Sequence, residues 1–194
     1  YNIAIGYQAF SQATDDCDGN IAIGVSAMSG NIGSNNVDNC ISIGYNSMAG
    51  VLTTDASGSV AIGQGVLNAN TEGVGNIGIG FQALNVSIDS DYNTAVGHQA
   101  LKAQTGITGE TSNTAVGYTA GKVVTTGVQN TMLGSFAGYS TLLVDKTVLV
   151  GYNAGGGVMT AAADGTVCIG ASAGAAITSG SGNLAIGRDA SKLL

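Results

Sequence analysis

Short alternations of large and small apolar residues recur along the whole chain, and a glycine follows each of them. In the first copy, Ile3 and Ile5 flank Ala4, and Gly6 comes next. Alternation with a period of two residues predicts a β-strand with two unlike faces. The glycines, called the central glycines below, are Gly6, Gly24, Gly44, Gly63, Gly80, Gly97, Gly117, Gly134, Gly151, Gly170 and Gly187. Their spacing of 17 to 20 residues predicts eleven coils that form one repeat domain over residues 1–194.

The two faces of each expected strand carry side chains of different size. We expect the bulky aliphatic residues, such as Ile3 and Ile5, to face the interior of the coil. The small residues between them, such as Ala4 and Ala22, would then let another backbone approach, so that both faces are buried. A glycine in all eleven copies predicts a positive φ angle or a lack of space for a Cβ atom.

The residues around this motif also repeat. Four residues after the central glycine, an apolar residue in the first six coils gives way to glycine from Gly121 onwards, which predicts a coil that narrows or repacks near residue 120. Asparagine opens seven of the eleven strands: Asn2, Asn20, Asn76, Asn93, Asn113, Asn130 and Asn183. Stacked asparagines can form an amide ladder between coils, or each can cap the preceding turn, and both alternatives stay open.

Segments of variable length separate the motifs and contain eleven of the twelve acidic residues, so we expect them to be the solvated outside of a parallel β-solenoid. The chain has no proline, 32 glycines and only 9% charged residues. Such a coil would enclose little core, so the small-residue face and the scarcity of charge predict lateral packing into a homotrimer. A net charge of −7 argues against nucleic-acid binding, and no apolar stretch is long enough for membrane insertion.

Several matches to chemical motifs are explained better by the repeat. The glycine pattern over Gly73–Gly78 lacks the strand and helix of a dinucleotide site, and Gly170–Gly174 resembles a nucleophile elbow only because Ser172 fills a variable position. The single histidine, His98, occupies a position that is tyrosine elsewhere. We therefore expect no enzyme activity, no catalytic residues and no cofactor. The acidic segments 15–19 and 89–93 match no calcium motif, so solvated loops are favoured there over a metal site.

The three cysteines form no metal-binding or disulfide-scaffold pattern. Cys17 and Cys40 lie in neighbouring repeats, where a disulfide between adjacent coils and two reduced thiols are alternatives. Cys168 takes the small position of its strand and is expected to be a buried, inert thiol.

The unit N-x-A-[IV]-G-x-x-A, as in 2–9, 93–100 and 113–120, resembles the head repeat of trimeric autotransporter adhesins and similar repeats of bacteriophage tail fibres. The resemblance covers essentially the whole chain. It implies a left-handed parallel β-roll, three chains per head, an exposed fibre and no catalysis. The adhesin repeat is shorter, so the longer linkers here fit the phage-fibre style better.

These observations predict a fragment of a longer trimeric fibre, extracellular and most simply part of a virion tail or appendage. Its variable loops would bind a host cell-surface receptor, either glycan or protein, through many weak contacts. The alternative is the head of a bacterial trimeric adhesin on the cell surface. Ice binding is a further alternative, because Thr94, Thr114 and Thr131 recur in consecutive copies, although only in three of eleven.

Overall fold

The fold is a single stack of coils in a computed structural model that describes residues 1–12, 17–30, 32, 36–53, 56–105, 108–141 and 143–191. One parallel sheet contains β1 (Ile3–Ile5), β2 (Ile21–Ile23), β3 (Ile41–Ile43), β4 (Val60–Ile62), β5 (Ile77–Ile79), β7 (Thr94–Val96), β9 (Thr114–Val116), β10 (Thr131–Leu133), β11 (Val148–Val150), β12 (Val167–Ile169) and β13 (Leu184–Ile186). A two-stranded sheet pairs β6 (Ser90–Asp91) with β8 (Gly109–Glu110), and the 3-10 helix η2 covers Ala161–Ala163.

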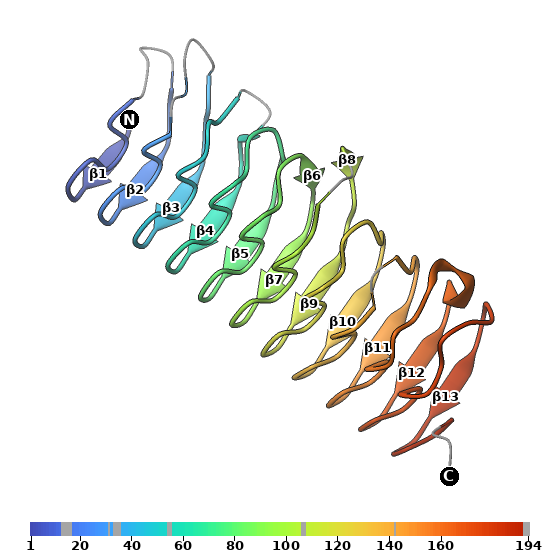
Figure 1. The fold of residues 1–194 in the computed structure, drawn as a ribbon. Helices are drawn as coiled ribbons and strands as arrows, with labels where there is room; N and C mark the ends of the chain where they lie inside the picture. Colours follow the sequence, from blue (N-terminus) through green and yellow to red (C-terminus); the bar gives the residue numbers. More distant parts are fainter. Residues whose placement is uncertain are drawn as a thin grey trace.

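Each coil contributes one strand to the eleven-stranded sheet, and the chain advances by one strand per turn (Figure 1). The pairing is parallel and residue for residue, so that Ile3, Ala4 and Ile5 lie beside Ile21, Ala22 and Ile23. The same register continues from strand to strand as far as β13. The predicted parallel β-solenoid is therefore confirmed, with about ten turns.

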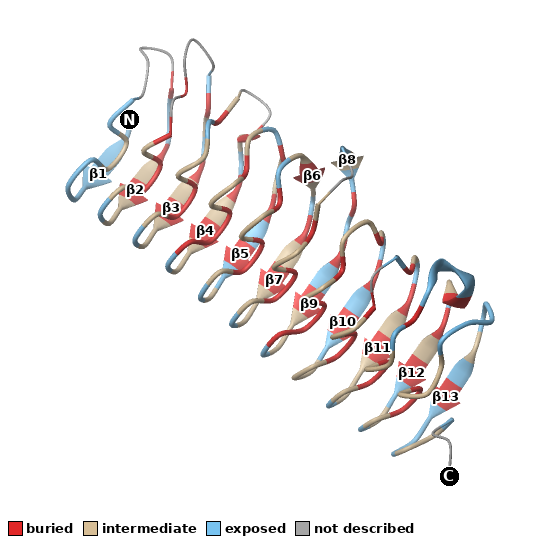
Figure 2. Cartoon of the chain, viewed as in Figure 1, coloured by how far each residue is buried: buried red, intermediate tan, exposed pale blue. Residues whose placement is uncertain are grey.

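The orientation expected for the strands is wrong. The middle residue of each strand from β2 onwards is buried, and it is small except in β10 and β11; the residues on either side are partly buried or exposed (Figure 2). Ala22 is completely buried, whereas Ile77 and Ile79 keep 38% and 36% of their surface exposed. The small residues point into the coil, and the bulky aliphatics form an outer face along the rod.

Small residues are required inside the coil because the opposite wall supplies the large ones. Met28 and Leu67, each four residues after a central glycine, are completely buried opposite strands whose middle residue is Ala22 or Ala61. In the coils of Gly138 and Gly155 the sizes exchange, because the middle strand residues are Met132 and Leu149. A Cβ atom on Gly138 would lie 2.6 Å from Sδ of Met132, in the strand of the same coil. The change near residue 120 is thus a repacking within one continuous stack.

The coil interior is larger than the sequence pattern predicts. The segments between motifs, expected to be only solvated loops, bury several aliphatic residues: Ile32, Val37, Leu52, Val124, Val144 and Met159. These side chains belong to one core cluster with the residues of the repeat motif. Each coil therefore has an apolar interior of its own.

The central glycines form a column in which both sequence-based explanations hold. Gly97 has a φ angle of 137°, and a Cβ atom there would lie 2.3 Å from the carbonyl oxygen of Gly117 in the next coil. Such a distance is far inside van der Waals contact, so the stack leaves no space for a side chain. At Gly187, in the last coil, only the positive φ remains, because a Cβ atom added there would meet nothing within 4 Å.

The strand-opening asparagines combine the two roles left open by the sequence. In Asn130, Oδ1 accepts the Thr147 backbone N–H (3.0 Å), and Nδ2 donates to the Val144 carbonyl oxygen (2.7 Å). Thr147 opens the next strand, and Val144 lies three residues before it. Each such asparagine therefore caps the turn of the following coil, and the stacked caps form a ladder. Asn2, Asn20 and Asn113 make the same pair of bonds.

Candidate binding surfaces

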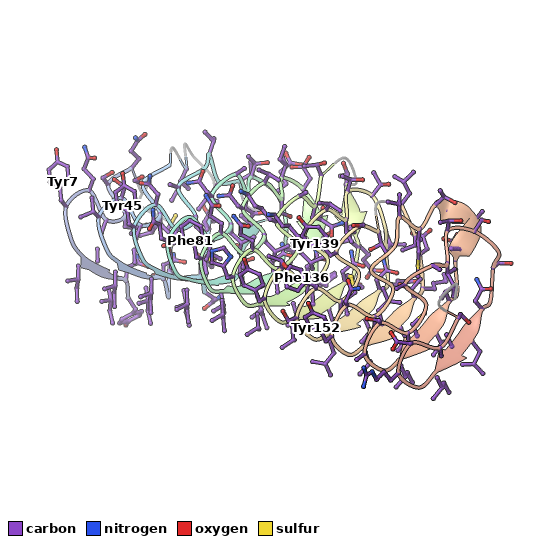
Figure 3. All side chains as sticks on the ribbon, turned by 60° about the horizontal axis from the view of Figure 1, so that its bottom comes forward. Tyr7, Tyr45, Phe81, Phe136, Tyr139 and Tyr152 are labelled. Carbon is purple, nitrogen blue, oxygen red and sulfur yellow. The ribbon has the colours of Figure 1, made fainter. Side chains whose placement is uncertain are left out.

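The outer face of the sheet is the first candidate surface. It consists of the first and third residue of all eleven strands, which are 19 aliphatic residues and the three threonines Thr94, Thr114 and Thr131. Among the most exposed are Leu133 (47%) and Ile169 (39%). Figure 3 shows side chains along the whole sheet projecting from the strands, away from the coils. The parallel register places like side chains above one another and makes this face continuous.

A second surface lies on the turns that follow the central glycines, where aromatic rings of successive coils contact one another. The ring centroids of Phe81 and His98 are 5.0 Å apart, and those of His98 and Tyr118 are 5.2 Å apart, with interplanar angles of 27° and 28°. Phe136 continues the contacts edge-on, at 5.2 Å from Tyr118 and 5.9 Å from Tyr152. We call these five residues the aromatic row.

The aromatic row is continuous only because, in one coil, the aromatic residue is the second residue after the central glycine and not the first. The row residue directly follows the central glycine in four coils, but in the coil of Gly134 that position is Ser135. Phe136, one residue later and with a φ angle of 60°, places its ring between Tyr118 and Tyr152 instead. Tyr139 packs against Phe136 at 5.7 Å (Figure 3). Sequence reasoning missed the row, because the repeat alignment shows a serine at this point.

Most acidic residues and the two lysines Lys102 and Lys122 lie on different edges of the coil. Every described acidic residue except Asp189 lies six to eight residues before the next central glycine, on the long linkers. Lys102 and Lys122 instead lie five residues after their glycines, on the turn edge that carries the aromatic row. They stack in adjacent coils, where the Ala103 N–H donates to the Lys122 carbonyl oxygen (3.1 Å). The Lys122 ammonium group lies 5.9 Å from the centroid of the Tyr139 ring.

The acidic residues of the linkers serve as caps between coils. Oδ1 of Asp38 accepts the Asp18 N–H (2.7 Å), and Oδ1 of Asp91 accepts the Val74 N–H (2.9 Å). Asp89 accepts the Thr71 hydroxyl (2.8 Å). Asp15 and Asp16 of the first acidic segment lie outside the described residues. Among the residues that the structure describes, no three His, Cys, Asp or Glu side chains converge in a way that could hold a metal ion.

The cysteines occupy different positions of the coil. Cys40 occupies the position at which other coils have the strand-opening asparagine. Its Sγ donates to the Ala56 carbonyl oxygen (3.3 Å). Ala56 lies three residues before Ser59, which opens the next strand, so the thiol bonds to the same position of the turn as an asparagine amide does. Burial raises the pKa of the Cys40 thiol from 9.0 to about 11. Cys17 lies three residues before Asn20, and the structure holds it and Cys40 as buried thiols with no disulfide between them. Cys168 is completely buried, and burial raises the pKa of its thiol too.

The remaining motif residues are not brought together. His98 is exposed in the sixth coil, whereas Ser172 lies in the tenth, four coil steps away. Residues 73–78 lead into β5, and a turn, not a helix, follows that strand. No helix of the described chain is long and apolar enough to cross a membrane. The described part of the chain also contains no pocket, so neither candidate surface is a cavity.

Comparison with known proteins adds no relative to this picture. No protein-family model, curated protein or solved structure matches the chain.

Proposed function

We propose that this chain is a segment of a homotrimeric fibre that attaches a virion, most simply a phage tail or appendage, to a host cell surface. The observation that carries the proposal is the outer face, which runs the length of the rod and presents aliphatic side chains outwards. Three rods that turn this face towards a common axis would bury it and leave the turns and linkers exposed for contact with a receptor. Weak contacts repeated on three chains add through effective concentration.

The size of the outer face supports self-association. Burying an aliphatic side chain contributes about 1.5–3 kcal/mol, at about 25 cal/mol per Å² of apolar surface. A fully exposed aliphatic side chain therefore offers roughly 60–120 Å² of apolar surface. Ten of the 22 residues are exposed and twelve are only partly exposed, so at an average exposure of about one third the face presents on the order of 650 Å². That area is slightly above the largest apolar patch of a typical monomer, about 300–600 Å². It approaches what one partner contributes to a standard interface, about 800 Å².

The number of chains and the biological setting follow from the resemblance of the repeat to trimeric fibre proteins. The trimer contact differs from the one expected from the sequence, because the small residues that were to form it lie inside the coil. The same resemblance supports the alternative, the head of a bacterial trimeric adhesin. Both alternatives use the same assembly and the same exposed surfaces.

The mass of the assembled protein tests the proposal. Light scattering after gel filtration is expected to give three times the chain mass of 19.0 kDa. Replacing Ile77 and Ile79 together by lysine places two charges in the middle of the outer face and is expected to lower the mass. Val158→Lys is the matched control, because Val158 is 55% exposed but lies outside this face. A wild-type protein that is a folded monomer by mass and circular dichroism would contradict the proposal.

Ice binding is the second candidate, favoured by the outward position of Thr94, Thr114 and Thr131 in the adjacent strands β7, β9 and β10. A flat, regular face of threonine and aliphatic groups on one wall of a solenoid is the surface that such a function needs. Thermal hysteresis of the wild-type protein, lost in Thr114→Lys, would favour it over attachment. A trimer without thermal hysteresis would exclude it.

A further inference from the structure

We propose that the aromatic row, together with Lys102 and Lys122, binds an extended acidic oligosaccharide. The inference rests on the proposed attachment function and names the class of receptor and the surface that recognises it. The rings of the row are partly exposed: Tyr118 and Tyr152 keep 50% and 59% of their surface exposed, and Phe81 keeps 37%. Sugar rings combine apolar C–H surfaces with polar hydroxyl rims, so they fit a surface that alternates aromatic and polar groups.

Polar groups border the row at the next position of each turn. Gln82, Gln99 and Asn153 follow Phe81, His98 and Tyr152 in sequence. The two glutamines stack between coils, where Nε2 of Gln99 donates to Oε1 of Gln82 (3.1 Å). One Oε1 and several N–H groups of this amide pair remain available to hydroxyl groups, because an amide carries two donors and an acceptor with two lone pairs.

The area of the row favours an oligosaccharide over a folded protein. A buried aromatic side chain contributes about 150–250 Å², so five rings at about two fifths exposure offer on the order of 400 Å². A protein partner normally needs about 800 Å² on each side. The row is also only one ring wide and spans four coil steps of about 4.8 Å, or about 19 Å in length. A linear chain of a few sugars matches both dimensions.

The charge on this edge favours an acidic chain but not a nucleic acid. Coils five to nine carry Lys102, Lys122 and His98 on the turn edge, whereas their acidic residues lie on the linker edge. Two ammonium groups in about 19 Å match an acidic polysaccharide with a charge on every one or two sugars. A nucleic-acid strand has one phosphate per about 3.4 Å and would place about six charges over the same length.

Isothermal titration of the full chain with hexagalacturonate tests the proposal, with cellohexaose as the neutral probe and a thymidine decanucleotide as the nucleic-acid probe. Hexagalacturonate is expected to bind more tightly than both. Replacing Tyr118 and Tyr152 together by alanine is expected to raise the dissociation constant about tenfold or more. Replacing Lys102 and Lys122 together by glutamine is expected to weaken hexagalacturonate binding and to remove the preference over cellohexaose.

Tyr7 and Tyr45 supply the matched control. They occupy the same repeat position, with 72% and 53% exposure, but Val25 separates them, so they form no row (Figure 3). Replacing both by alanine is expected to leave the dissociation constant unchanged. Equal losses in the Tyr118/Tyr152 and Tyr7/Tyr45 variants, no binding of hexagalacturonate, or tighter binding of the decanucleotide would each overturn the proposal.

Two further measurements separate this proposal from the proposed function. If the Tyr118/Tyr152 variant has a lower mass than the wild type, the row is a contact between copies of the chain, and the proposal fails while the trimer stands. Fluorescently labelled wild type and the same variant are also compared on a panel of bacterial cells. Equal attachment of the two overturns the role of the row alone, whereas no attachment of the wild type contradicts the attachment function.

Discussion

Removing one asparagine from the middle of the ladder is expected to destabilise the stack strongly. Asn130→Ala removes the acceptor of the Thr147 N–H and hydroxyl and the donor to the Val144 carbonyl oxygen. Asn130 and Val144 are each 1% exposed, and Thr147 is completely buried. Each buried polar group left without a partner costs about 1–3 kcal/mol, so the three together cost about 3–6 kcal/mol if water enters in part.

That loss is a large share of the stability of a folded domain, about 5–15 kcal/mol. Because each coil contacts only its neighbours, the damage is local, and the two halves of the solenoid are expected to unfold in separate transitions. Urea unfolding followed by far-ultraviolet circular dichroism measures both effects, at one fixed protein concentration because association contributes to the apparent stability.

Asn183→Ala is the control for this prediction. Asn183 opens the last strand, where its amide donates to the Thr166 hydroxyl (3.1 Å) and to the Gly180 carbonyl oxygen, and β13 has no following strand in the sheet to cap. A loss of less than about 1 kcal/mol in this variant is expected, because partly exposed groups turn to water. Losses of equal size in Asn130→Ala and Asn183→Ala would refute the interpretation of the ladder as a set of caps.

Three further predictions concern the column, the core and a thiol. Gly97→Ala is expected to prevent folding or to split the stack, because its Cβ atom would lie 2.3 Å from a carbonyl oxygen. In Gly187→Ala the Cβ atom meets nothing within 4 Å, so the positive φ angle alone destabilises the variant. Thermal unfolding of the two variants compares these effects. Met132→Ala is expected to cost about 2–5 kcal/mol in urea unfolding, and adding Gly138→Leu should recover part of it, since leucines at this position of earlier coils adopt φ angles of 46° to 50°. Because the pKa of Cys40 is raised in the folded state, the unfolded chain loses the thiol proton first as the pH rises. The free energy of unfolding should therefore fall between pH 9.0 and about 11, by at most about 2–3 kcal/mol. Cys40→Ser should remove that part of the pH dependence.

The location of every strand in the large sheet could be predicted, but the direction of its side chains could not. Alternation shows that a strand has two unlike faces and leaves open which one is inside. The answer lies in the opposite wall, where Met28 and Leu67 fill the coil and require a small partner on the strand. The sequence does contain one indication of this orientation. Where the middle strand residue is large, as at Met132, the residue four positions after the central glycine is small, as at Gly138, so the two positions share one space.

The short pair of β6 and β8 and the aromatic row were also beyond the sequence. Ser90–Asp91 and Gly109–Glu110 have no alternating pattern, and they pair only because the stack places two linkers side by side. The ring of Phe136 joins the row from a neighbouring position of the turn, which a comparison of repeats by position does not reveal. Such contacts depend on the three-dimensional distance between neighbouring coils, which an alignment of the repeats shows only in part.

The uniform register has a consequence for how such a fibre changes over time. Since every coil meets its neighbours through the same strand pairing and glycine contact, a duplication or deletion of one whole repeat creates no new kind of junction. A shift by part of a repeat would misalign the glycines and place a side chain against a carbonyl oxygen. The length of the rod can therefore change only in whole coils, each about 4.8 Å long, and not by part of a coil.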